Sequence, residues 1–92
     1  MSGKTLFSRT QLEIILFFYQ NPTSIDTARG ISAWINEDAV NVRKALTDLV
    51  KKNILIAHKV TSTTGYSYTR DIKILKGIKC VMDEYQKKRR RA

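Results

Sequence analysis

The chain has 92 residues, 42% of them hydrophobic, and a formal net charge of +9. This is enough for one small domain with a single core and too little for two. With one cysteine, Cys80, and one histidine, His58, the chain cannot build a disulfide framework or a Cys/His zinc cluster. We therefore expect a reducing compartment, no metal and no cofactor. We expect His58 to be an ordinary strand residue and Cys80 a small core or interface residue.

Basic charge is concentrated at the C-terminus, where residues 87–91 read KKRRR. A chain this basic favours an anionic partner, nucleic acid first and a membrane surface second. The longest apolar run, IILFFY at 14–19, is far shorter than the roughly 20 residues that span a bilayer, and the first residues contain no apolar signal segment. We therefore expect a soluble cytoplasmic protein with no membrane partner.

A first helix is predicted from Arg9 to Gln20. Ser8 and Gln11 have the spacing of a capping box, and Asn21-Pro22 is a stop signal. Both sides of this helix are apolar, so we expect neighbours to cover it on two sides. One stripe holds Leu12, Ile15, Leu16 and Tyr19, and the opposite one holds Ile14, Phe17 and Phe18.

A second, short helix is predicted from about Thr27 to Ile35. Ile31 and Ile35 point to the core, with Trp34 at the edge, although Gly30 costs about 1 kcal/mol relative to alanine inside a helix. The following INED, residues 35–38, reads as a tight turn. In it Asn36 suits a left-handed backbone and Asp38 suits the cap of the next helix.

The third helix is predicted over residues 38–52 and is amphipathic. Its apolar stripe consists of Ala39, Val42, Leu46, Leu49 and Val50. Val40 projects to the opposite side, beside Lys44, Thr47 and Lys51. An apolar residue among cations on an exposed face is either an ordinary surface valine or part of a contact with a partner.

A hairpin and a last helix complete the predicted order. Residues 54–60 have strand character, TSTTG at 61–65 is a turn in which Gly65 suits positive φ, and residues 66–71 alternate as a returning strand. The last helix runs from about Ile72 to Lys88. Its apolar stripe comprises Ile72, Leu75, Ile78, Met82 and Tyr85.

This order, and the pattern of ISAWINEDAVNVRKALTDLVKKNILIAHKV at 31–60, resemble the winged helix-turn-helix family of small prokaryotic transcription regulators, MarR-like and PadR-like proteins among them. The resemblance covers roughly residues 8–71. Asn36 stands where the turn usually carries glycine, and Glu37 where an apolar residue is common. The resemblance implies a mostly α fold with a small β-hairpin wing and an additional C-terminal helix. Residues 1–86 would form one domain, with its core at 8–71 and a dimerisation helix at about 72–88, followed by a basic tail at 87–92.

The resemblance also implies that the 38–52 helix lies in the DNA major groove and that the 58–70 hairpin is the wing. On that helix Val40 suits a thymine methyl, Asn41 adenine, and Arg43 or Lys44 guanine or phosphate. Thr47 and Lys51 would touch the DNA backbone. Wing contacts would come from Lys59, Ser62, Thr63, Thr64, Gly65 and Arg70. Glu37 and Asp38 are interpreted as structural, because carboxylates are favoured at a helix N-terminus.

A homodimer is expected, because the apolar surface of the first and last helices exceeds what a short monomer is expected to cover. The predicted interface comprises Ile14, Phe17, Phe18, Leu75, Ile78, Met82 and Tyr85. The alternative is a monomer in which the last helix folds over the first.

These features favour a sequence-specific regulator of transcription that binds double-stranded DNA, acting by occupancy as a dimeric repressor. Two alternatives are a protein-binding winged-helix module and a non-specific architectural or replication-associated DNA binder. An enzyme is not expected, because paired catalytic groups and a phosphate-cradling glycine loop are missing from the sequence. The basic tail is a solvated end, an additional phosphate-binding arm or, in a eukaryotic setting, a nuclear localisation signal.

Overall fold

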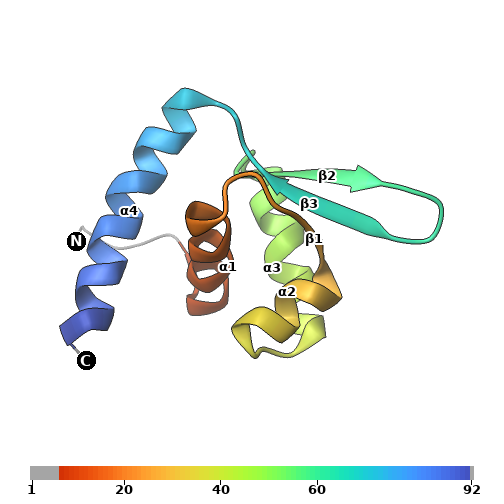
Figure 1. Cartoon of the computed structure of the whole chain (residues 1–92), viewed down its shortest axis with the longest axis horizontal. Coiled ribbons are helices and arrows are strands. Elements are labelled where there is room, and N and C mark those ends of the chain that lie inside the picture. Colours follow the sequence, from red (N-terminus) through yellow and green to blue (C-terminus); the bar gives the residue numbers. More distant parts are fainter. Residues whose placement is uncertain (1–6, 92) are drawn as a thin grey trace.

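The computed structural model describes residues 7–91, and side chains as far as Arg89. The order is helix, short strand, two helices, hairpin and long helix (Figure 1). Its elements are α1 (Arg9–Gln20), β1 (Ile25–Thr27), α2 (Ala28–Ile35), α3 (Ala39–Lys51), β2 (Leu55–Lys59), β3 (Thr64–Tyr68) and α4 (Ile72–Arg91). None of the helices in the described part of the chain is long and apolar enough to cross a membrane.

Helix α1 has the predicted bounds and the predicted capping box. The Gln11 amide donates to Ser8 Oγ at 3.1 Å, and the Ser8 amide donates back to Gln11 Oε1 at 2.9 Å. At the other end, the Asn21 side chain donates to the Phe17 carbonyl at 2.9 Å, and Pro22 follows. The local sequence therefore fixes both ends of α1 without help from tertiary contacts.

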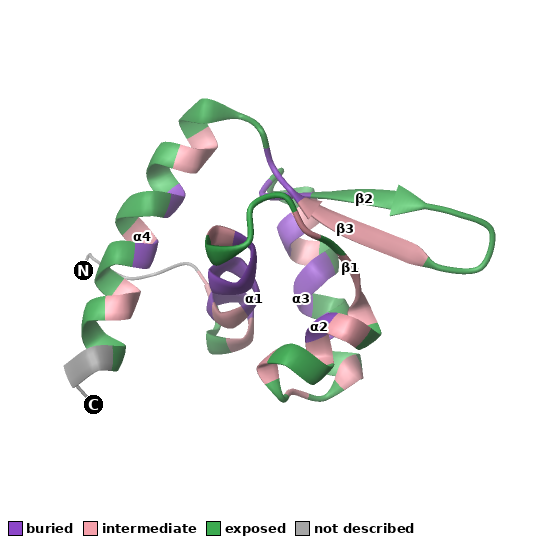
Figure 2. Cartoon of the chain, in the orientation of Figure 1, coloured by how far each residue is buried: buried purple, intermediate pink, exposed green. Residues whose placement is uncertain are grey.

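Both apolar sides of α1 are covered, as predicted. Ile14, Ile15 and Phe18 are fully buried. Helix α3 packs on one side of α1 and α4 on the other, so that α1 lies at the centre of the molecule (Figure 2). Among the described elements, α4 contacts α1 and no other. The core therefore forms around α1, and every other helix is placed relative to it.

Helices α2 and α3 are each followed by an asparagine whose backbone adopts the left-handed conformation. Asn36 has φ 57° and ψ 51°, as predicted, and Asn53, which the sequence analysis did not single out, has φ 63°. After α3, the Ile54 amide donates to the Leu49 carbonyl at 3.0 Å, which is the bond expected at such a helix end. Asp38 then caps α3 by accepting from the Asn41 amide at 3.2 Å. Asn36 and Asp38 therefore set the turn between α2 and α3.

The sheet has three antiparallel strands in the order β1-β3-β2, where the sequence predicted a two-stranded hairpin. Strand β1 is three residues long, too short for the alternation by which a strand is recognised in sequence. The prediction for Gly65 was also wrong: no described glycine has positive φ, and Gly65 lies within β3, paired with His58 and Thr27. A Cβ at Gly65 would approach Ile25 Cγ2 to 3.1 Å, so glycine here permits a close approach between strands.

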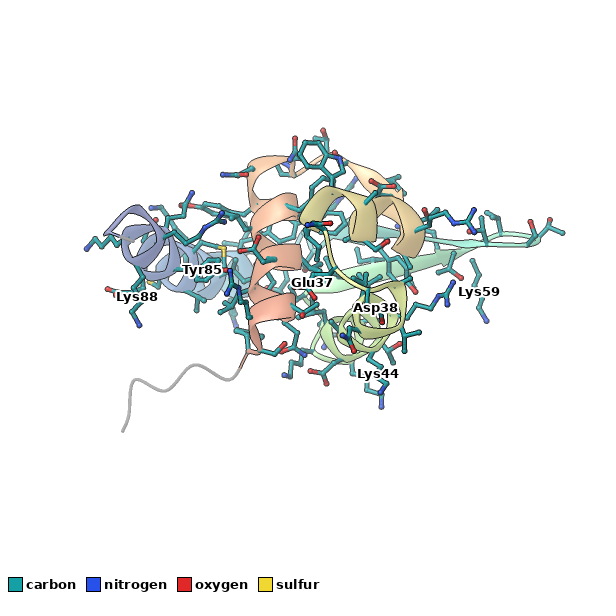
Figure 3. The ribbon with its side chains drawn as sticks, turned by 90° about the horizontal axis from the view of Figure 1, so that it is seen from below. Glu37, Asp38, Lys44, Lys59, Tyr85 and Lys88 are labelled. Atoms are coloured by element: carbon teal, nitrogen blue, oxygen red, sulfur yellow. The ribbon has the colours of Figure 1, made fainter. Side chains whose placement is uncertain are left out.

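Helix α4 extends further than predicted and takes up most of the basic tail. Residues 87–91 are helical, so a separate tail starting at Lys87 is wrong for these residues, and Ala92 lies outside the described residues. Arg89 forms an ion pair with Glu13 of α1 at 3.2 Å. Tyr85 points toward α1 and donates a hydrogen bond to the same Glu13 carboxylate (Figure 3). The pKa of Tyr85 is raised to about 12, mainly because the side chain is partly buried and secondly because of this hydrogen bond.

Two predictions about buried side chains need correction. The predicted interface residues Ile14, Phe17, Phe18, Ile78 and Met82 are all buried within one chain. Helix α4 folds over α1, and the rings of Phe17 and Phe18 also pack against Trp34 of α2 and Tyr68 of β3. Leu75 and Tyr85 are partly buried against the same core. Cys80 is exposed on α4, so the prediction of a core position for it was wrong.

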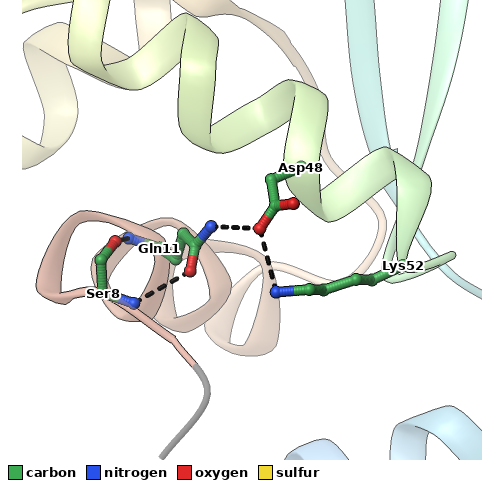
Figure 4. A network of polar contacts seen from close by, with 4 residues as sticks. All are labelled: Ser8, Gln11, Asp48 and Lys52. Carbon is green, nitrogen blue, oxygen red and sulfur yellow. Dashed lines mark hydrogen bonds and ion pairs between the residues drawn. The ribbon is translucent and has the colours of Figure 1, made fainter.

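The Gln11–Asp48–Lys52 network joins α1 to α3 (Figure 4). Gln11 Nε2 donates to Asp48 Oδ2 at 2.6 Å, and Lys52 Nζ lies 2.9 Å from the same oxygen. The hydrogen bond from Lys52, and then the one from Gln11, hold the pKa of Asp48 below its usual value of 3.8. Since Gln11 also closes the capping box, one side chain couples the start of α1 to the last turn of α3.

Gly30, which appeared unfavourable in the sequence, makes room for Asp26. The Asp26 carboxylate accepts from the Thr27 amide at 2.8 Å and lies under the first turn of α2. A Cβ at Gly30 would lie 2.9 Å from Asp26 Cγ, closer than real Cβ contacts. An alanine at this position would therefore force the Asp26 carboxylate to move.

Gly30→Ala is expected to lower the free energy of unfolding by about 1–2 kcal/mol, because the clash with Asp26 exceeds the gain in helix propensity. Gly77→Ala in α4 is the matched control: nothing lies within 4 Å of its added Cβ, so stability should rise by about 0.5–1 kcal/mol. Urea unfolding followed by circular dichroism measures both. Equal effects of the two substitutions, or the absence of rescue by Asp26→Ala in the Gly30→Ala background, would contradict the packing role.

Asp48→Asn is expected to lower Tm at pH 7, because Asn cannot replace the charged partner of Lys52. The lowered pKa means that the carboxylate stabilises the fold fully above about pH 3.8 and loses this effect as the pH falls further. The Tm difference from wild type should therefore persist down to about pH 3.8 and shrink as the pH falls below that value. The control is Asp83→Asn, which breaks only an exposed pair with Lys79 on α4 and should change Tm less at pH 7.

Candidate DNA-binding surface

The outer face of α3 is free of the core, as predicted. Its inner residues Val42, Leu46 and Leu49 are fully buried. All six side chains predicted to face DNA are exposed: Val40, Asn41, Arg43, Lys44, Thr47 and Lys51. Val40 is 55% exposed, which leaves its methyl groups available for contact.

These six side chains spread across the exposed side of α3. At 100° per residue, Val40, Lys44 and Lys51 occupy the middle of that face, with Thr47 beside them. Asn41 lies at one margin and Arg43 at the other. The Thr47 hydroxyl donates to the Arg43 carbonyl at 3.0 Å, so its proton is already used within the helix. Figure 3 shows Lys44 projecting away from the body of the molecule.

The wing is the β2–β3 hairpin, which extends beyond the helices (Figure 1). Its tip is closed by a hydrogen bond from the Val60 amide to the Thr63 carbonyl at 2.9 Å. Lys59, Ser62 and Thr63 are exposed there, while Thr64 and Gly65 are partly buried. The predicted hydroxyl-rich tip is therefore present.

Arg70 does not lie at the tip of the wing. Strand β3 ends at Tyr68, and the Thr69 amide donates to the Ile54 carbonyl at 3.0 Å, at the base of the hairpin. Arg70 follows directly and is exposed in the connection to α4. The assignment of Arg70 to the returning strand was therefore wrong, because the strand is shorter than its alternating sequence suggested.

A cleft of about 590 Å³ separates α3 from the wing tip. It brings together Arg43 of α3 and the predicted wing residues Ser62, Thr63 and Thr64. Its remaining lining residues, Thr27, Ala28, Arg29 and Tyr66, come from β1, α2 and β3. Arg29 was not among the predicted site residues, although an arginine in the first turn of α2, the helix before α3, was a signal that the sequence offered.

A smaller cleft, of about 220 Å³, lies on the other side of α3. Asn41 and Lys44 line it together with Ser8, Thr10 and Gln11 from the start of α1. The two clefts therefore flank α3, with Arg43 lining one and Asn41 and Lys44 the other, while Val40, Thr47 and Lys51 line neither.

The two acidic residues before α3 have structural partners. Asp38 caps α3, and Glu37 Oε1 accepts a hydrogen bond from Thr10 Oγ1 at 3.4 Å. Figure 3 shows both residues in the connection between α2 and α3. His58 is exposed on β2, with Nε2 2.7 Å from Ser67 Oγ. In the described part of the chain, no group of three His, Cys, Asp or Glu side chains is arranged to hold a metal ion.

No protein-family model matches the sequence, and none of the curated proteins matches it. Solved structures do match. A possible transcriptional regulator from Methanosarcina mazei Go1 has a TM-score of 0.70 and 15% identity, over 89% of this chain and 72% of that one. MepR, a transcription regulator of the Staphylococcus aureus multidrug efflux pump MepA, has a TM-score of 0.68 and 15% identity, over 90% and 63%.

A third match comes from Mycobacterium bovis. It is Mb0332, a homodimeric winged helix-turn-helix DNA-binding domain of a possible ArsR-family transcriptional regulator. The TM-score is 0.64 at 14% identity, over 84% of this chain and 70% of that one. The chain thus spans less than two thirds of MepR and a larger share of the other two. What it shares with all three is the fold predicted from the sequence: a winged helix-turn-helix with an additional C-terminal helix.

Proposed function

We propose that this protein is a cytoplasmic transcription regulator that binds specific sequences in double-stranded DNA, with α3 in the major groove and the β2–β3 hairpin as wing. The observation that carries the proposal is the exposed outer face of α3, which presents Val40, Lys44 and Lys51 beside a hydroxyl-rich wing tip. The transcription regulators that share its fold support the same function.

Direct readout rests on the residues in the middle of that face. The methyl groups of Val40 suit a thymine methyl, and Lys44 can donate to the major-groove acceptors of guanine. Asn41, at the margin next to α1, reaches adenine only if DNA approaches from that side. Lys51, in the last turn of α3, and Lys59, in the wing, contact phosphates that position the protein.

We further propose that the regulator is a homodimer acting as a repressor by occupying its site. The homodimeric state given for Mb0332 supports the dimer. Because Ile14, Phe18 and Met82 are buried within one chain, the dimer contact uses either α4 surface outside the core or an α4 exchanged between chains. Either arrangement would let two α3 helices read two half-sites about one DNA turn apart.

The function is tested by selecting bound duplexes from a randomised pool over several rounds. We expect a two-half-site sequence that binds at least about a thousandfold more tightly than random DNA. Val40→Ala and Lys44→Ala should each lower the preference at one base pair about tenfold, because each removes one base-edge contact. Lys76→Ala on α4 is the control and should leave the preference unchanged.

If the protein bound all duplexes equally, its function would be that of a non-specific architectural DNA binder and not that of a regulator. If the protein bound no DNA, the remaining alternative would be a winged-helix module that binds protein. Either result contradicts the proposal.

The dimer is tested by sedimentation velocity over a range of protein concentrations. Ile72→Asp is preferred to Ile78→Asp, because Ile72 is 67% exposed whereas Ile78 is 4% exposed and its replacement would disrupt the core. We expect wild type to associate with increasing concentration, and Ile72→Asp to weaken association without lowering the Tm of dilute protein. A monomer at every concentration, bound to DNA as one chain per site, would contradict the dimer.

A further inference from the structure

The cleft between α3 and the wing tip has three walls of different origin. Arg43 comes from α3, Ser62, Thr63 and Thr64 from the wing, and Arg29 from the first turn of α2. Its lining residues include two arginines and no acidic side chain. The cleft is therefore positively charged and rich in hydrogen-bond donors, which is the chemistry that holds a phosphate.

DNA geometry explains why such a cleft lies at this place. A single sugar-phosphate strand separates the major groove from the adjacent minor groove at each edge. If α3 occupies the major groove and the wing tip reaches the neighbouring minor groove, that strand must pass between α3 and the wing tip. This is where the cleft lies, so its lining residues would face phosphates rather than base edges.

We propose that this cleft binds the sugar-phosphate strand between the two grooves, with Arg29 and Arg43 as its two phosphate contacts. The proposal rests on the proposed function and makes it more specific. It names Arg29, on α2, as a DNA contact, and it assigns Arg43 to the DNA backbone, leaving base readout to the middle of the α3 face.

The full positive charge at the α2 wall comes from the Arg29 side chain, and two amide groups at the start of α2 are occupied within the chain. The Gly30 amide donates to Thr27 Oγ1 at 3.1 Å, and the Thr27 amide donates to Asp26 at 2.8 Å. Asp26 is absent from the lining of the cleft and is turned beneath α2. The exposed Arg29 guanidinium has no ion pair within the described part of the chain, so binding a phosphate would break no existing contact.

Arg43 is suited to the DNA backbone by its position on α3. It lies at the margin of the exposed face next to the wing, whereas Asn41 lies at the opposite margin, in the cleft beside α1. The two positions differ by about 160° around the helix axis at 100° per residue. A helix centred on Val40 and Lys44 in the major groove therefore places Arg43 against the strand on the wing side.

The test measures the salt dependence of binding to the selected duplex and to an unrelated one for wild type, Arg29→Ala and Arg43→Ala. Each substitution should lower affinity about tenfold at 0.1 M salt on both duplexes. Each should also reduce the slope of log K against log[salt] by about 0.9, the effect of one lost phosphate contact. The ratio between the two duplexes should not change. Lys76→Ala, which removes one positive charge from α4, should change the slope much less, and thermal melts check that all variants are folded.

A phosphate-replacement scan separates direct contact from general attraction. In the selected duplex, a neutral methylphosphonate replaces one phosphate at a time along the strand between the two grooves. Replacement of one particular phosphate should weaken wild-type binding about tenfold but should not weaken the binding of Arg29→Ala any further. Replacement of a second phosphate should likewise weaken wild-type binding but not the binding of Arg43→Ala.

Several outcomes would overturn the assignment. If wild type binds its selected duplex specifically but Arg29→Ala keeps the wild-type slope, the cleft is not a strand site although the regulator function stands. If Arg43→Ala changes the base preference, Arg43 reads sequence. If wild type binds no duplex, both the function and the strand site are refuted.

Discussion

Burial of both sides of α1 is the constraint on which the rest of the structure depends. A helix with apolar residues around most of its circumference is stable in water only if it is covered from opposite directions, and α3 and α4 provide that cover. The apolar stripe of α3 is buried in this packing. Its polar side is therefore left facing solvent, with Val40 among the cations. The same packing that forms the core thus creates the surface proposed to read DNA.

Capping interactions and left-handed residues fix where α3 begins and ends. Asn36 adopts the left-handed conformation, Asp38 caps α3, and Asn53 ends it. The Gln11–Asp48–Lys52 network then ties α3 to the start of α1. A helix that reads base pairs must meet them with little angular freedom, and these contacts, as the proposed role of α3 requires, hold it at both ends and through Asp48 in its last turn.

The sequence predicted what local periodicity and capping determine. The bounds of α1, the left-handed Asn36, the Asp38 cap and the outward direction of Val40 were all predicted correctly. Features that depend on tertiary pairing were missed. Strand β1 exists only because β3 lies beside it, and its three residues carry no repeating pattern.

Other errors have the same origin. Gly65 looked like a turn residue because glycine favours turns, whereas its actual role is a close approach to Ile25 across the sheet. The buried residues of α1 and α4 looked like an interface, because amphipathic sequence shows that a face needs cover and does not show which chain covers it. Arg29 could not be linked to Arg43, because only the fold brings α2, α3 and the wing tip to one cleft.

The net charge of +9 overstates the attraction that DNA would feel at the proposed α3–wing surface. Helix α4 and the wing lie toward opposite ends of the longest axis of a molecule 42 Å long (Figure 1). The screening length at 0.1 M salt is only about 10 Å, so lysines on the far side of α4 add little to binding at α3. Arg89 is further engaged by Glu13. Affinity at physiological salt should therefore depend on the few cations around α3, the wing and the cleft, where a single arginine matters more than the basic run at the C-terminus.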